Sequence, residues 1–374
     1  MTALKAGPKT PPVEKQIAIL EASKKTPPRI MALWDRGGPS PTYIYRRGNY
    51  LTPGAFVTPG APAVLCDPAR PFTIQPPYPG AKSTGRRLAL ARWLVHPDQP
   101  LTARVMVNRL WKHHYGAGIV RSLGNFGKTG DPPTHPELLD FLAREFIRQG
   151  WSVKALQRKM LLAGVYRQRS AVSPESAAGD PPNRLLSRIN LRRLEAEVLR
   201  DTLLLAAGEL DETPFGPAEP VQVRPDGMVV SGKRRSVYVQ QLRKHPPSLL
   251  ESFDLPTMNP NCLQRDNSLV ATQALYLQND AAIRNLAEKC AEQVLLAVGD
   301  DSARQIQQSY RRILGRAPLP EELAACQEKL TELKQAWTAE PQSAGKLTPP
   351  EAARRALATV CHAVMNSASF LYVD

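Results

Sequence analysis

Proline sets the first limit on how this chain of 374 residues can fold. The sequence holds 36 prolines, roughly twice the average usage. Proline lacks a backbone donor and breaks helices, and within residues 48–85 it recurs in Pro–Gly pairs that begin at Pro53, Pro59 and Pro79. A stretch of this kind inside a compact domain is expected to wrap the domain's surface. We therefore predict a long proline-rich strap at 48–85.

The residues before the strap are predicted to form a tether and a small hairpin. Residues 1–28 are the tether, and prolines bracket one short helix in it at 13–25, because proline disfavours helix in the residue before it. Between residues 29 and 47, two short runs of alternating apolar residues flank Gly37 and Gly38. This alternation predicts a first β-hairpin with a wide turn.

From residue 86 onwards the apolar positions follow helical spacing. Helices are predicted at 86–96, 101–115, after the Thr134 cap to 149, from 153, at 191–207 and from 268. Their ends carry capping signals. These signals are capping boxes at Thr134 with Glu137, Ser302 with Gln305 and Thr348 with Glu351, an N-cap at Ser152, and closing glycines at Gly150 and Gly208.

Residues 214–245 interrupt the helices. A turn at 225–227 lies between short runs at 221–223 and 236–239, which predicts a second hairpin. The whole pattern predicts a mainly α fold with a minor β part, α+β in its details: a helical domain with two small β-hairpins and the proline-rich strap. We expect this single helix-rich domain at 29–374, with a core signature at 101–169, the hairpin at 214–245 and C-terminal helices at 268–374.

The charge of the chain is unevenly distributed. The formal net charge is +15, and residues 1–170 alone hold 26 basic and 9 acidic side chains. Such asymmetry indicates an anionic partner, although a basic surface that packs against an acidic neighbour, or does nothing specific, explains it too. Nothing beyond charge favours nucleic acid. No apolar run approaches the roughly 18 residues of a membrane span, and the first residues lack the pattern of a signal peptide, so the chain as written is expected to be cytoplasmic.

Several motifs are absent or incomplete. The five cysteines form no Cys-x-x-Cys pair and no Cys-x-x-Cys-His haem attachment, so buried free thiols are expected. Gly127-Lys-Thr129 resembles part of a phosphate-binding loop, but Ser122 replaces its first glycine and Pro132 follows where a helix must begin. We predict no cofactor and no metal.

One polar cluster falls within the core signature. Arginine forks bind carboxylate, sulfate or phosphate groups, and nearby Asn and Trp side chains suit sugars as well. An alternative is that the arginines make interhelical pairs with Glu137, Asp140 or Glu145, and that the histidines serve caps and packing instead of a metal or general base. The candidate residues for an anionic-ligand or polar cluster are Arg104, Asn108, Arg109, Trp111, His113, His114, Arg121 and His135.

A second charged run lies at 192–201. Arg193, Glu197 and Asp201 follow i,i+4 spacing, which predicts a salt-bridged face on the helix 191–207. A glycosidase-like pair would need Glu195 or Asp201 to meet another acid in a cleft.

These residues and the segments around them resemble one family. The resemblance covers roughly residues 27–374, and the family is the carboxy-terminal domain of unknown function that is abundant in planctomycete bacteria (DUF1553, PSD1). The matching segments are 104–121, 125–127, 133–140, 150–154, 166–168, 193–201, 235–238, 253–256, 265–268, 273–275 and Asn279.

The resemblance implies a cellular setting and no activity. Proteins of this family usually carry a second uncharacterised domain and often a cytochrome-c-like haem domain with an export signal. It therefore implies an exported or periplasmic location, and a haem-domain partner encoded nearby. Two functions are predicted: a non-enzymatic, scaffold-like module that partners an exported redox protein, or an enzyme or binding protein that acts on an anionic polysaccharide.

Overall fold

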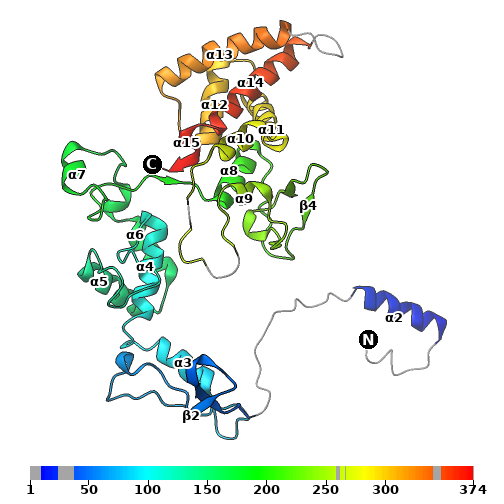
Figure 1. Ribbon diagram of the computed structural model, residues 1–374. Helices are drawn as coiled ribbons and strands as arrows, with labels where there is room; N and C mark the ends of the chain where they lie inside the picture. Colours follow the sequence, from blue (N-terminus) through cyan, green and yellow to red (C-terminus); the bar gives the residue numbers. More distant parts are fainter. Residues whose placement is uncertain (1–9, 24–37, 258–261, 266, 340–346, 374) are drawn as a thin grey trace. The chain divides into compact units, whose positions relative to one another are not determined.

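The computed structural model describes residues 10–23, 38–257, 262–265, 267–339 and 347–373. Helices dominate it and its sheets are small two-stranded antiparallel ones, which confirms the predicted mainly α fold (Figure 1). The chain forms two compact units, Met1–Gln99 and Pro100–Asp374, and we describe each by itself. The predicted single domain at 29–374, with the strap lying over its helices, stays a prediction.

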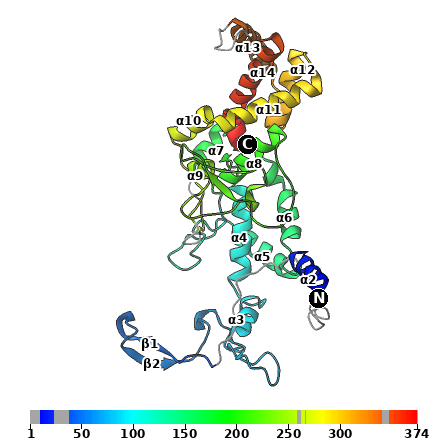
Figure 2. The ribbon, with the colours of Figure 1, turned by 90° about the vertical axis from the view of Figure 1, so that its right-hand side faces the viewer.

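The first unit is built around one hairpin and one helix. Its elements are α2 (Pro11–Ser23), β1 (Thr42–Tyr45), η1 (Arg46–Gly48), β2 (Pro53–Val57), η2 (Ala63–Leu65) and α3 (Arg86–Leu94). Strand β1 pairs with β2, with Tyr43 opposite Phe56; Figure 2 shows this hairpin.

The first hairpin differs from the prediction. Its turn follows Tyr45, and its second strand comes from the strap at 48–85, which we had predicted to be loop throughout. Pro53 is tolerated as the first residue of a strand. A Cβ on Gly54 would lie 2.8 Å from the Ile44 carbonyl oxygen, so glycine allows the two strands to approach. The predicted strand before Gly37 lies outside the described residues.

The second unit holds two hydrophobic cores. The first lies among α4 (Thr102–Tyr115), α5 (Pro136–Arg148) and α6 (Val153–Leu161), which Figure 2 shows beside one another. Two short helices follow, η3 (Gly164–Arg167) and α7 (Pro174–Gly179). Buried side chains of the first core include Val107, Trp111, Tyr115, Leu142, Phe146, Leu156 and Met160.

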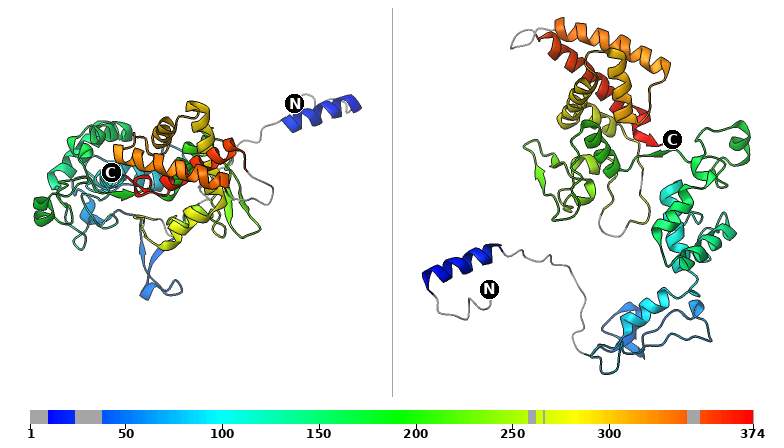
Figure 3. Two further views of the ribbon diagram at one scale, coloured as in Figure 1. Left: turned by 90° about the horizontal axis from the view of Figure 1, so that it is seen from above. Right: turned by 180° about the vertical axis from the view of Figure 1, so that it is seen from behind.

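The second core lies among the later helices. Its helices α11 and α14 lie side by side and α13 packs on α14 (Figure 3). The elements of this part are β3 (Arg192–Arg193), α8 (Ala196–Ala207), β4 (Val221–Val223), β5 (Val229–Ser231), η4 (Ser236–Tyr238), α9 (Ser248–Ser252), α10 (Ala271–Asn279), α11 (Ala281–Val298), α12 (Ser302–Leu314), α13 (Pro320–Ala339), α14 (Pro349–Met365), α15 (Ala368–Leu371) and β6 (Tyr372–Val373). Strand β4 pairs with β5 around the predicted turn, although 236–238 is a 3-10 helix instead of strand.

The helix ends confirm some of the predicted caps. Ser152 accepts a hydrogen bond from the Ala155 amide. The Glu351 carboxylate accepts from the amide and the hydroxyl of Thr348, at 3.0 and 2.6 Å. Gly208 adopts a left-handed φ of 73° at the end of α8.

Two other predicted capping boxes are wrong. The Thr134 hydroxyl turns to the Ile119 carbonyl, and α5 begins after His135. Asp301, not Ser302, caps α12 by accepting from the Arg304 amide at 3.1 Å. Asp301 thus takes the capping role in α12, whereas the side chain of His135, the N-cap residue of α5, makes no capping hydrogen bond.

No helix in the described part of the chain is both long enough and apolar enough to cross a membrane.

Candidate functional site

Arg104 is the member of the predicted cluster that meets a carboxylate. Its Nε donates to Asp140 Oδ1 at 2.6 Å, from α4 to α5, and its guanidinium also donates to the Pro100 carbonyl. The hydrogen bond from Arg104 holds the pKa of Asp140 below its usual value. This is the interhelical pair that the alternative interpretation predicted.

Asn108 and Trp111 lie in the first core. The Asn108 side chain is 1% exposed and exchanges two hydrogen bonds of 2.8 Å with the backbone of Val120. Trp111 stacks on Tyr115 with 4.0 Å between ring centroids, and the Tyr115 hydroxyl donates to the Met160 carbonyl. Both side chains therefore hold α4 against its neighbours and present no face to a ligand.

The basic side chains at the end of α4 lie nearer the surface. Arg109 and His113 are exposed and His114 is half-buried. Burial lowers the pKa of both histidines, with Lys112 adding to the effect at His113 and Arg192 at His114. A lowered pKa keeps the imidazoles neutral at physiological pH.

The remaining two candidates are in loops. Arg121 donates to the Pro182 carbonyl at 3.1 Å, and the His135 ring nitrogen Nδ1 lies 3.0 Å from the Thr134 hydroxyl. Among the described residues, no three His, Cys, Asp or Glu side chains are grouped so that they could hold a metal ion. The structure thus distributes the eight candidates over separate local contacts.

A polar network that the sequence pattern did not predict joins β3, at Arg193, to residues 254, 268 and 273. Arg193, whose side chain is 6% exposed, donates to Asp254 Oδ2 at 2.6 Å and to Gln273 Oε1 at 2.9 Å. The Ser268 hydroxyl donates to Asp254 Oδ1 at 2.7 Å. Burial alone would raise the pKa of Asp254, but the hydrogen bonds from Ser268 and Arg193 outweigh it and lower the pKa.

The network continues along α8. Glu197 accepts two hydrogen bonds from Arg265, at 2.5 and 2.8 Å, and Glu195 lies 3.6 Å from the same guanidinium. Further along, the buried Arg200 donates to Asp201, whose Oδ1 also accepts from the Ser236 hydroxyl at 2.7 Å.

The predicted salt-bridged face at 191–207 is therefore wrong. Helix α8 begins at Ala196, because Arg192 and Arg193 form strand β3 with β6, and the charged side chains bind partners on other segments. Helical spacing could not show partners this far along the chain. The available signal was the resemblance, since its matching segments include both members of the pairs Arg193–Asp254 and Glu197–Arg265.

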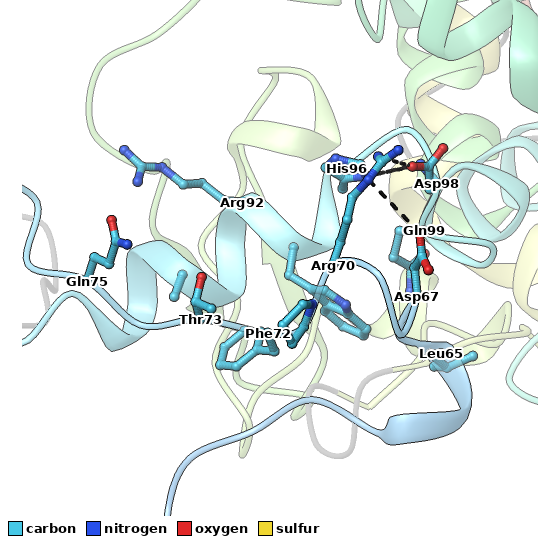
Figure 4. Close-up of a pocket in the computed structure, with 13 residues that line it drawn as sticks. Leu65, Asp67, Arg70, Phe72, Thr73, Gln75, Arg92, His96, Asp98 and Gln99 are labelled. Carbon is cyan, nitrogen blue, oxygen red and sulfur yellow. Dashed lines mark hydrogen bonds and ion pairs between the residues drawn. The ribbon is translucent and has the colours of Figure 1, made fainter.

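A small polar pocket lies in the first unit (Figure 4). Its volume is about 240 Å³. Arg70 makes ion pairs with Asp98 and, at 4.0 Å, with Asp67, and His96 lies 3.6 Å from Asp98. Phe72 forms part of the wall, and none of the eight predicted residues lines this pocket.

The fold and these contacts define a helical protein whose charged side chains bind segments of its own chain together. The family model of PSD1, described as a protein of unknown function (DUF1553), matches residues 86–330. The chain belongs to this family, as the resemblance indicated. No curated protein and no solved structure gives a significant match.

Proposed function

We propose that this protein is a non-enzymatic, scaffold-like module that binds an acidic partner protein through its second unit. The observation that carries the proposal is the division of charges in residues 101–169. The buried or half-buried carboxylates there form ion pairs with basic side chains of the same segment: Asp140 pairs with Arg104, and Glu145 pairs with Arg148 and Lys159. Several cations on the same helices stay exposed, and among the described residues none of them makes an ion pair. They are Arg109, Arg144, Lys154, Arg158, Arg167 and Arg169.

Exposed cations without internal partners fit an anionic surface better than an anionic small molecule. They belong to α4, α5, α6 and the segment after α6. Complementary charge over a surface speeds association and selects partners. Asn108 and Arg193 belong to the segments that match the family, and both make hydrogen bonds within the protein. A role of these residues in maintaining the fold supports a scaffold function.

The partner that the resemblance implies is an exported redox protein with a cytochrome-c-like haem domain, encoded nearby. An acidic face on such a protein would complement the cations of residues 101–169. We therefore propose this class of protein as the partner, with the haem on the partner's side.

The test is association with the haem-domain protein encoded nearest to this chain in its genome. Equal amounts of the two purified proteins are mixed, and haem absorbance is followed through gel filtration at low and at high salt. We expect co-elution at low salt that weakens as salt screens the charges. The variant Arg109→Glu/Arg158→Glu should weaken it at least tenfold, whereas Arg284→Glu/Arg311→Glu, an equal charge change on the exposed surface of α11 and α12, should not.

Two outcomes oppose the proposal. Absence of co-elution at low salt contradicts the haem-protein partner. Binding to sulfated or uronic glycans on an array, lost in Arg109→Glu/Arg158→Glu, would replace the proposal by the anionic-polysaccharide prediction.

A further inference from the structure

The second unit contains a cavity of about 620 Å³, within the size range of small-molecule sites. It opens to solvent and is lined by α8, the β4–β5 hairpin, the start of α9 and the junction of α10 and α11. Much of its wall is apolar, with Leu203, Val229 and Ile283 buried and Leu249 and Leu286 half-buried. Such a wall favours the apolar body of a ligand.

The charged groups that line this cavity are mainly cationic. Four cations line it, Arg200, Arg224, Lys233 and Lys289, against two carboxylates, Glu209 and Asp280. The lining side chains by themselves therefore carry two more positive than negative charges, while Arg200, Arg224 and Lys289 also pair with carboxylates outside the lining, Asp201, Asp226 and Glu292.

The two carboxylates are already engaged. Asp280 Oδ1 caps α11 by accepting from the Ala282 and Ile283 amides, and Arg224 lies 3.5 Å from Asp280 Oδ2. Glu209 pairs with Lys233, whose side chain stays 63% exposed. The Lys233 ammonium therefore has donors left for a second anion.

Tyr276 adds a neutral donor to the same cavity. Burial raises its pKa to about 12, with Asp280 adding to the effect, so the hydroxyl keeps its proton at physiological pH. Among the described residues, nothing makes a hydrogen bond with this hydroxyl. A ligand oxygen would accept a hydrogen bond from it.

We propose that this cavity binds a small amphipathic organic anion, with its apolar body against Leu203, Ile283 and Leu286 and its acid group near the polar side chains of the lining, Lys233, Lys289, Arg224 and Tyr276. The site goes beyond the proposed scaffold function and does not depend on it, because the cations at 101–169 are different residues. Size, apolar wall and positive charge together select this ligand class over a neutral or cationic one.

The probe is 8-anilinonaphthalene-1-sulfonate, a fluorescent amphipathic anion. Its binding to the full chain is titrated, and decanoate, decanol and decyltrimethylammonium are compared as competitors. We expect one saturable site from which decanoate displaces the probe, while the cationic amphiphile of equal chain length does not.

Variants locate the probe. Lys289→Gln and Lys233→Gln should each weaken binding about twofold to fivefold, as expected for the loss of one partly exposed ion pair. Lys329→Gln is the matched control, because Lys329 and Lys289 both pair with a glutamate three residues on, and only Lys289 lines the cavity. Leu286→Trp, which fills the cavity, should abolish binding while circular dichroism shows the helices intact.

The proposal is overturned if Lys289→Gln and Lys233→Gln bind the probe as wild type does, or as Lys329→Gln does. It is equally overturned if the three amphiphiles compete alike, because the probe would then report apolar surface without charge selection.

Discussion

Asn108 and Val120 bind each other as two paired strands would, with Asn108 Nδ2 donating to the Val120 carbonyl and the Val120 amide donating to Asn108 Oδ1, both at 2.8 Å. The contact joins the middle of α4 to the loop that follows it. A Cβ on Gly118 would lie within 3.0 Å of both polar atoms of the Asn108 side chain, so glycine leaves room for this pair. The buried amide thereby fixes the path of the chain out of α4.

Asn108→Ala should destabilise the protein by about 2–4 kcal/mol, because it leaves a buried amide and a buried carbonyl of Val120 without partners. Asn108→Asp should cost at least as much, since a carboxylate cannot donate to the Val120 carbonyl. Urea denaturation gives the free energy of unfolding. Gln335→Ala removes an exposed amide from α13 and is the control. An Asn108→Ala effect equal to that of Gln335→Ala would refute the structural role of the pair.

The pair Arg193–Asp254 is predicted to be strongly coupled. Asp254→Asn leaves the buried Arg193 guanidinium without its carboxylate, and we expect a loss of about 3–5 kcal/mol in the free energy of unfolding. Asp254 has a φ of 65°, which asparagine also tolerates, so the substitution should add no backbone strain. The double variant Arg193→Met/Asp254→Asn should lose much less than the sum of the two single losses.

A double-mutant cycle measures this coupling. Exposed Arg304 and Asp301, 3.6 Å apart on one helix turn, provide a comparison cycle in which less than about 1 kcal/mol is expected. Additive losses at Arg193 and Asp254, within about 0.5 kcal/mol, would mean that the two charges do not depend on each other.

Glu145 is expected to make stability depend on acid pH. Hydrogen bonds from Arg148 and Lys159 lower its pKa from 4.5 to about 2. Since the folded protein binds this proton more weakly than the unfolded chain, protonation favours unfolding. The stabilisation is therefore complete above about pH 4.5 and is lost as the pH falls toward about 2.

Denaturation of wild type and Glu145→Gln at a series of pH values checks this. The difference between them should stay constant between about pH 5 and 7 and shrink below about pH 4.5. Glu322→Gln should behave alike, because Arg316 lowers the pKa of Glu322 to about 2. A Glu145→Gln difference that persists unchanged at the lowest pH would contradict the assignment.

The cysteines should react in the order of their exposure. Cys262 is exposed, Cys66 and Cys326 are intermediate, and Cys290 and Cys361 are buried. A hydrogen bond with Cys290 and burial raise the pKa of the Cys361 thiol, which slows alkylation further because the thiolate is the reactive form. Pulse labelling with iodoacetamide and mass spectrometry should find Cys262 first, and Cys290 and Cys361 only in denaturant. Equal labelling rates would show that the second core is open.

Some local signals in the sequence predicted local structure correctly. The caps at Ser152, Thr348 and Gly208 depend on residues within one helix turn, and the structure has all three. The turn at 225–227 was also predicted correctly, because the strands of this short hairpin lie close together in the sequence.

Contacts between distant segments could not be predicted in the same way. The start of α8 was misplaced because β6, the partner of β3, lies near residue 372, and spacing within one helix cannot reveal such a partner. The charges at 193–201 were misread for the same reason. Whether the eight cluster candidates bind a ligand stays a prediction.

The pairing of β3 with β6 also determines the order in which parts of the chain can fold during translation. Arg192 pairs with Val373, and the Leu194 amide donates to the Leu371 carbonyl at 2.8 Å. Helices α4, α5 and α6 find their partners within sixty residues of chain, so they can assemble while the rest is still being translated. The segment that leads into α8 must wait for residues 371–373. The nascent chain therefore exposes an unfinished second core until translation has almost passed these residues, which is when a chaperone would have most to protect.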